Sequence, residues 1–227
     1  MARLCFDYGH GGSDPGAIYN GRKEKNDVLS LGKAVAAELR RHGVVVDETR
    51  TSDKTVSLQE RVNFENRKAY DYFISFHRNA FKPEAAKGVE TYTYLKPKAK
   101  TKALAGKIQT ALVGVGFTNR GVKEANFYVL RETKASAILV EIGFIDNTED
   151  NRLFDSKRNE IVKAIAGAIL SHLGIKDELQ EALNVLVMKG VIVSPEYWLE
   201  NAREGKSVKG EYAAILIKRA AEILTSK

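Results

Sequence analysis

The sequence is poor in cysteine and proline and has no long hydrophobic run. A single cysteine, Cys5, among 227 residues excludes an intrachain disulfide framework and a zinc site built from paired cysteines. Four prolines and eighteen glycines are too few for a collagen-like or low-complexity chain. No apolar run reaches the roughly 18 to 20 residues that cross a bilayer, and Asp7 comes too early for the apolar core of a signal peptide. We therefore expect a globular protein with no membrane span that is made in the cytoplasm.

The net charge of +7 lies entirely on residues 1–175, because residues 176–227 carry equal numbers of basic and acidic side chains. A basic surface attracts polyanions such as nucleic acid, anionic lipid or acidic wall polymers. The densest group of lysines lies in residues 96–107. No helix-turn-helix, zinc finger or base-stacking motif is present, so we expect no nucleic-acid partner.

Residues 1–175 alternate between strand and helix patterns, which indicates an α/β fold with a twisted, mostly parallel or mixed sheet flanked by helices. Amphipathic spacing and the capping pair Ser57 and Glu60 mark the helices. The predicted strands are Leu4–Asp7, Val44–Thr49, Tyr72–Phe76, Val89–Leu95 and Ile138–Ile142, and the predicted helices are Glu24–His42, Leu58–Ala69, Lys98–Val115 and Asn159–Leu173.

The pattern changes to helices alone after residues 174–178, which predicts a small all-helical module over residues 178–227. Ser194 and Pro195 form a helix start in which the serine hydroxyl is expected to cap the first turn. Trp198 is the only tryptophan, and we interpret it as a core residue, with stacking on a sugar as the alternative. About fifty residues are marginal alone, so the module is expected to pack on the larger domain or on a copy of itself.

Four side chains are candidates for chemistry at the carboxyl edge of the sheet, where loops vary above a rigid frame. His10 follows the first predicted strand between glycines, and His77 directly follows the third. Glu141 lies in the apolar last strand, where an unpartnered carboxylate is costly. Glu24 opens the first crossover helix and depends on closeness to His10 for any role. The two other histidines, His42 and His172, are expected to act only at helix ends.

Two imidazoles and a carboxylate with an open coordination position are typical of a hydrolytic zinc site, and a further carboxylate can act as general base. The spacing of these residues matches no short local zinc motif, so the residues alone leave metal binding open. The chain also carries a set of ordered motifs: DYGHGGSDPGA at 7–17, Glu24, RTSD at 50–53 with LQER at 58–61, SFHRNA at 75–80 and VEIGFIDN at 140–147.

These motifs resemble those of the zinc-dependent N-acetylmuramoyl-L-alanine amidases, the peptidoglycan hydrolases of bacteria and their phages. The resemblance covers residues 1–173 and implies that His10, Glu24 and His77 bind Zn²⁺ and that Glu141 is catalytic. Tyr8 and Arg78 depart from it, since the family commonly has proline and a small residue there. Because Arg78 adjoins a ligand, its effect on the substrate groove is open.

The resemblance implies cleavage of the amide between N-acetylmuramic acid and L-alanine of the stem peptide. Within this family the chain is most similar to a phage or prophage endolysin, although a bacterial autolysin or sporulation enzyme would also fit the resemblance. Such a protein would be made in the bacterial cytoplasm and would act on the wall after release. The alternatives are a zinc peptidase acting on stem peptides and a catalytically silent wall-binding protein. With this resemblance, the module over residues 178–227 is expected to bind the cell wall or to self-associate.

Overall fold

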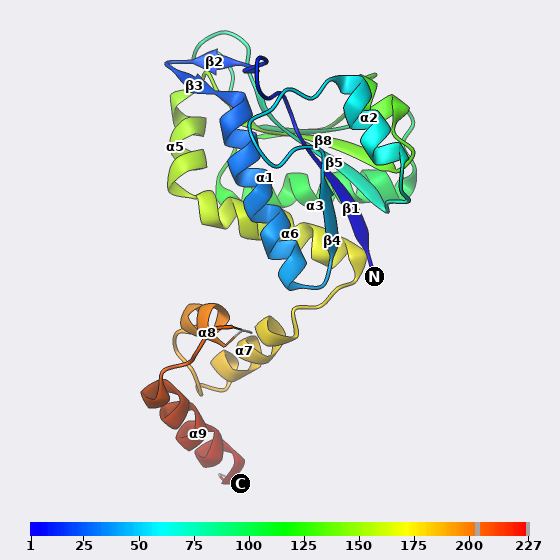
Figure 1. The fold of residues 1–227 in the computed structure, drawn as a ribbon. Helices are drawn as coiled ribbons and strands as arrows, with labels where there is room; N and C mark the ends of the chain where they lie inside the picture. The colour runs from blue at the N-terminus through cyan, green and yellow to red at the C-terminus, as the bar shows by residue number, and fades with distance from the viewer. Residues whose placement is uncertain (203–204, 226–227) are drawn as a thin grey trace. The chain divides into compact units, whose positions relative to one another are not determined.

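The computed structural model describes residues 1–202 and 205–225 and contains two compact units, Met1–Ile175 and Lys176–Lys227 (Figure 1). No helix within the described ranges is long and apolar enough to cross a membrane.

The first unit is built on a six-stranded sheet with the order β4-β1-β5-β8-β6-β7. All neighbouring pairs are parallel except β6 and β8, which are antiparallel. This confirms the predicted α/β fold with a mostly parallel sheet. The strands are β1 (Arg3–Tyr8), β4 (Val45–Glu48), β5 (Tyr72–Asn79), β6 (Val89–Thr93), β7 (Asn119–Glu124) and β8 (Ser136–Phe144), and a hairpin of β2 (Ile18–Tyr19) and β3 (Arg22–Lys23) stands apart.

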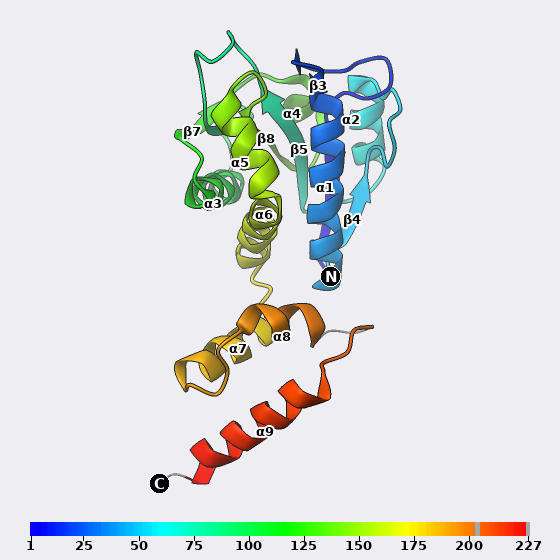
Figure 2. The same ribbon diagram turned by 90° about the vertical axis from the view of Figure 1, so that its left-hand side faces the viewer.

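Helices cover both faces of the sheet (Figure 1; Figure 2). The larger core lies between the sheet and helices α1 (Glu24–Arg41), α3 (Ala99–Val115) and α6 (Arg158–Leu173). A smaller core lies on the other face, where α2 (Leu58–Asn66) and α4 (Tyr128–Glu132) pack, and it includes the fully buried Cys5. Helix α5 (Thr148–Ser156) follows β8 and precedes α6. The second face is thus covered by α2 and α4, and His77 and Glu141 point to it, because they alternate along β5 and β8 with residues of the larger core.

The local signals behave largely as predicted. The Ser57 side chain accepts a hydrogen bond from the Glu60 backbone and Glu60 returns one to Ser57, so the capping box that opens α2 is present. Helix α2 ends at Asn66 and not at Ala69, because the chain turns there to enter β5. The edge strand β7 and the helices α4 and α5 were not predicted.

The second unit contains α7 (Glu178–Met188), α8 (Pro195–Asn201) and α9 (Gly210–Thr225). Its core is small, and Trp198 lies within it at 8% exposure, which confirms the interpretation of this residue as core. Helix α8 begins at Pro195 as predicted, but the prediction that Ser194 caps it is wrong, since its hydroxyl makes no capping hydrogen bond. The core consists of Leu183, Val191, Ile192 and Trp198.

Candidate metal and catalytic site

The loop after β1 presents His10 in a backbone conformation that needs glycine around it. His10 has a φ of 62°, and Gly11 and Gly12 also have positive φ. A Cβ on Gly9 would lie 2.2 Å from Cε1 of His77, so only glycine allows the loop to pass this close to the second imidazole. Gly11 and Gly12 therefore allow the turn, and Gly9 makes room for His77.

Two buried arginines hold this loop in place. The Arg50 guanidinium donates to the carbonyl of Gly9 at 2.8 Å, and the Arg61 guanidinium donates to the carbonyl of His10 at 2.7 Å. Arg61 also pairs with Asp7, which is buried at the end of β1. Fully buried cations of this kind are retained when they satisfy several acceptors at once, and here those acceptors fix the position of His10.

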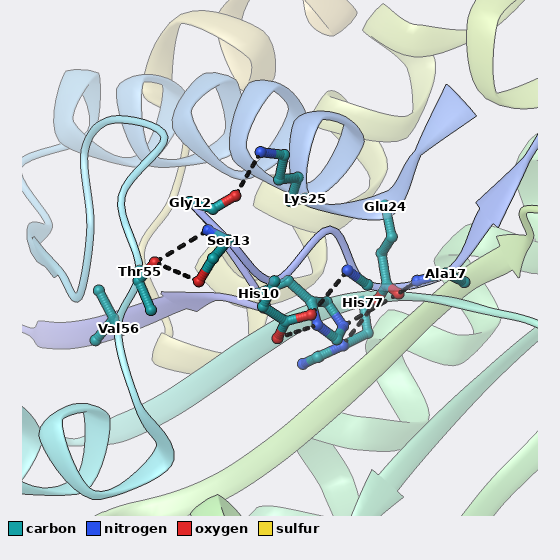
Figure 3. Close-up of polar contacts among 12 residues, drawn as sticks. His10, Gly12, Ser13, Ala17, Glu24, Lys25, Thr55, Val56 and His77 are labelled. Carbon is teal, nitrogen blue, oxygen red and sulfur yellow. Dashed lines mark hydrogen bonds and ion pairs between the residues drawn. The ribbon is translucent and has the colours of Figure 1, made fainter. Parts of the chain in front are cut away.

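Glu24, the first residue of α1, lies between the two imidazoles (Figure 3). Its Oε2 is 3.1 Å from Nε2 of His10, and its Oε1 is 2.9 Å from Nδ1 of His77. The backbone N–H groups of Ala17 and Arg78 each donate to it at 3.0 Å. The residue with the weakest case from sequence position is thus at the centre of the cluster.

The ligand atoms that His10, Glu24 and His77 offer all lie within 4.8 Å of one another, so this trio could hold a metal ion. The two imidazole rings are 5.1 Å apart and nearly perpendicular. Two nitrogens and one carboxylate oxygen form a donor set that suits zinc in a site with an open position. The chemistry and the spacing of the donors therefore fit the metal that the sequence implies.

The three groups shift one another's proton affinity. Burial alone would raise the pKa of Glu24, but hydrogen bonds from His10 and His77 outweigh it and hold the pKa well below its usual range. Burial alone would lower the pKa of both imidazoles, and the hydrogen bond and charge of Glu24 raise it instead. The cluster thus carries a carboxylate that stays ionised and two imidazoles that hold protons more strongly than usual.

Glu141 lies directly beside His77 in the register between β5 and β8. His77 lies within β5 and not just beyond it, because β5 continues to Asn79, and Glu141 lies within β8 as predicted. Oε2 of Glu141 is buried and has no hydrogen-bond partner in the structure. Burial, followed by the negative charges of Glu24 and Glu90, raises the pKa of Glu141 to about 7. A carboxyl group with this affinity can both accept and donate a proton near neutral pH.

Asp14 is a functional candidate that the sequence analysis did not single out. Its Oδ2 lies 2.8 Å from Nδ1 of His10, while its Oδ1 accepts from the backbone of Gly16 at 3.0 Å. A carboxylate on one imidazole nitrogen fixes the tautomer that leaves the other nitrogen free to bind a metal. Its place four residues after His10, in a loop with glycine and proline, was the available signal.

Arg78 does not line the side of the sheet that carries the cluster. Successive residues of a strand point to opposite faces, and the fully buried Arg78 side chain pairs with Asp27 at 2.7 Å and stacks over Phe154. Tyr8 is also buried, and its hydroxyl donates to Glu48 at 2.8 Å. The side chains of Tyr8 and Arg78, which differ from the family motif, therefore pack away from His77.

His42 and His172 lie away from the cluster, as expected. His42 is the C-cap of α1, and His172, in the last turn of α6, hydrogen-bonds the Tyr72 hydroxyl at 2.6 Å.

A family model described as N-acetylmuramoyl-L-alanine amidase matches residues 4–171. The chain belongs to this amidase family. It is 37% identical over 189 residues to the sporulation-specific N-acetylmuramoyl-L-alanine amidase of Bacillus subtilis, which covers 82% of this chain and 69% of that protein. It is 38% identical over 186 residues to the endolysin of Bacillus phage SPP1, which covers 78% of this chain and 68% of that protein.

The fold comparison agrees with membership of the amidase family. The catalytic domain of CwlV, an amidase from Bacillus (Paenibacillus) polymyxa var. colistinus, superposes with a TM-score of 0.71 at 30% identity. The superposition covers 78% of this chain and all of that domain. The family model ends at residue 171, within the first unit, so the second unit has to be interpreted from its own residues.

Proposed function

We propose that this amidase hydrolyses the bond between the lactyl group of N-acetylmuramic acid and L-alanine of the stem peptide, as an endolysin or autolysin. The observation that carries the proposal is the convergence of His10, Glu24 and His77 around one point, with Glu141 beside His77 and one carboxyl oxygen unpartnered. Family membership supports the same substrate.

His10, Glu24 and His77 would hold Zn²⁺, with Asp14 orienting His10. A zinc ion bound there supplies Lewis acidity and lowers the pKa of a water molecule to roughly 7. Glu24 contributes negative charge to the site, with one oxygen beside Nε2 of His10 and the other beside Nδ1 of His77. The backbone bonds from Ala17 and Arg78 keep that carboxylate in place.

Glu141 would move the proton. Its carboxylate accepts a proton from the attacking water and returns it to the departing alanine nitrogen, because an amide nitrogen leaves poorly unless it is protonated. The apolar burial that raises the pKa of Glu141 fits both halves of this cycle.

Glu141→Gln tests this role. The variant should retain its metal, because Glu141 is not one of the proposed ligands. General acid–base catalysis is worth about 100 to 10,000-fold in rate, so the release of stem peptides from purified peptidoglycan should slow by at least roughly 100-fold. Mass analysis of the fragments should show a free alanine amino terminus and an intact lactyl acid. Near-normal lysis by the variant would reject the role of Glu141, while cleavage within the stem peptide would favour the zinc peptidase alternative.

A catalytically silent wall-binding protein is the other alternative. It is disfavoured because His10, Glu24 and His77 form one cluster and Glu141 lies opposite His77 in the pairing of β5 with β8. We also propose that the protein is made in the cytoplasm and acts on the wall after release, which cell fractionation tests.

The second unit is proposed as an interaction module that binds the wall or a second copy of the chain. It exposes many large apolar side chains for its size, and Trp198 is not among them. Deleting residues 178–227 should reduce wall binding or the number of chains per particle in solution. If both stay unchanged, the proposal is rejected. The exposed side chains of the second unit include Val185, Val187, Met188, Val193, Ile215, Ile217 and Leu224.

Acidic wall polymers are proposed partners of the basic first unit, and a salt-dependent loss of wall binding would support them.

A further inference from the structure

A row of charged side chains continues from the metal-ligand cluster across the sheet. His77 lies opposite Glu141 in the pairing of β5 with β8, and Glu141 lies opposite Glu90 in the pairing of β8 with β6. Directly paired residues point to the same face, with Cβ atoms about 5 Å apart. His77, Glu141 and Glu90 therefore form one row that leads from the cluster toward β7.

Glu90 is an acid held by two cations from β7. Its side chain is 3% exposed and accepts from Nε of Arg120 at 3.1 Å and from the Lys123 ammonium. Asn79 and Tyr92 donate to its other oxygen at 2.5 Å and 2.9 Å. One cation would neutralise Glu90, so the group as a whole carries a surplus positive charge.

The two cations reach toward solvent. The side chain of Arg120 is 33% exposed and that of Lys123 is 40% exposed. The Arg120 guanidinium stacks over the Phe144 ring at 4.8 Å. Among the described residues, the structure gives the two terminal nitrogens of Arg120 no hydrogen-bond partner. Glu90 and Phe144 thus hold this guanidinium in place and leave its outer edge open.

The direction of the substrate follows from the role of Glu141, so this inference rests on the proposed function. Glu141 returns its proton to the alanine nitrogen, so the bound stem peptide must extend from the metal-ligand cluster on the Glu141 side. Neighbouring strands are about 4.8 Å apart, which places β6 and β7 about 5 to 10 Å beyond β8. The carboxylate on the second stem residue lies about two residues, or roughly 7 Å, from the alanine nitrogen in an extended chain.

We propose that Arg120 and Lys123 form a subsite for the carboxylate on the second residue of the stem peptide, with Glu90 as their positioning residue. A guanidinium presents paired N–H donors that match a carboxylate, and a nearby ammonium adds charge. A stem whose second residue is amidated has no anion to place there. The subsite therefore makes the amidase selective for stems with the free acid.

The test compares two soluble substrates, N-acetylmuramoyl-L-alanyl-γ-D-glutamyl-L-lysine and its counterpart with D-isoglutamine as the second residue. In both, the γ-carboxyl is used up in the bond to lysine, so only the first has a free carboxylate on the second residue. We expect the wild-type protein to favour the acid by about tenfold or more in kcat/KM, mainly through KM, since hydrogen bonds to charged groups are the stronger class. In the double variant Arg120→Gln, Lys123→Gln the ratio should fall to within about twofold. The conservative variant Arg120→Lys should retain an intermediate ratio.

The matched control is Lys102→Gln, which removes an exposed lysine on α3, in the layer on the opposite face of the sheet. It should keep the wild-type ratio. Thermal unfolding of each variant shows whether the fold is intact, and a misfolded double variant leaves the decision to the Arg120→Lys ratio. Equal turnover of the two substrates by the wild-type protein, or a preference that survives in a folded double variant, would overturn the subsite.

A binding measurement separates this inference from the proposed function. Calorimetry with Glu141→Gln should show tighter binding of the acid than of the amide, and the difference should vanish when Arg120 and Lys123 are also replaced. If the wild-type protein cleaves neither compound nor peptidoglycan, the proposed function fails, whereas equal binding of the two compounds overturns the subsite alone.

Discussion

Asp14→Asn should weaken metal binding through the tautomer of His10. In the structure Asp14 Oδ2 faces Nδ1 of His10 at 2.8 Å, and Oδ1 accepts the Gly16 N–H at 3.0 Å. An asparagine that keeps the Gly16 bond through its oxygen must point its NH₂ group at Nδ1 of His10. The ring then needs its proton on Nε2, the nitrogen that faces Glu24 and would bind the ion.

The size of this effect follows from measured losses at similar positions. Removing a carboxylate that orients a histidine ligand costs about 10 to 100-fold in metal affinity, or about 1.4 to 2.7 kcal/mol. Asp14→Ala should cost less than Asp14→Asn, because alanine leaves His10 free to choose its tautomer. Competition for zinc against a chromophoric chelator at pH 8 measures both.

Asp71→Asn is the control, because Asp71 is an exposed acid that accepts a backbone N–H beside the start of β1, at the other end of the strands. Its zinc affinity should equal that of the wild-type protein. An Asp14→Asn variant within about threefold of wild type, or an alanine variant weaker than the asparagine one, would refute the tautomer argument.

Two further predictions concern the elements around the site. Arg78→Met removes the guanidinium that pairs with Asp27, and we expect the free energy of unfolding in urea to fall by about 3 kcal/mol. This is the lower end for a broken buried pair, because Arg22 still contacts Asp27. A loss below about 1 kcal/mol would contradict the buried pair. Zinc affinity should fall as the pH drops from 8 to 6, by up to about tenfold per pH unit for each proton displaced, because the raised pKa of His10 and His77 keeps protons on the ligands to a higher pH. Chelator competition at several pH values checks this, and an affinity that does not change would contradict it.

The sequence predicted the sheet and the main crossover helices because their apolar residues repeat with clear periods. Strand β7 was missed because it lies at the sheet edge, where every residue is partly or fully exposed and no alternation is visible. Helix α5 did carry a signal, since Asn147 caps it and acids follow in its first turn. Asn147 was interpreted only as the last residue of the motif around Glu141, and no helix was predicted after it.

The site was predicted unevenly for a physical reason. His10, His77 and Glu141 stand out because they interrupt apolar strands or glycine turns, whereas an acid at a helix start such as Glu24 is ordinary. The central position of Glu24 arises from how the loop at 9–23 folds back, which no local pattern encodes. The cations of β7 gain their meaning only from neighbours brought close by the fold, whereas Asp14 had a local signal in its place four residues after His10.

The central claim is that His10, Glu24 and His77 together bind a divalent ion that Glu141 does not ligate. Anomalous diffraction at the zinc edge from crystals of the zinc-loaded protein tests it most directly. The account predicts one main peak, with both imidazole nitrogens about 2.0 to 2.1 Å from it, a Glu24 oxygen at about 2.0 to 2.2 Å and an open position toward Glu141. A peak elsewhere, no peak at this cluster, or Glu141 as a ligand in place of Glu24 would contradict it.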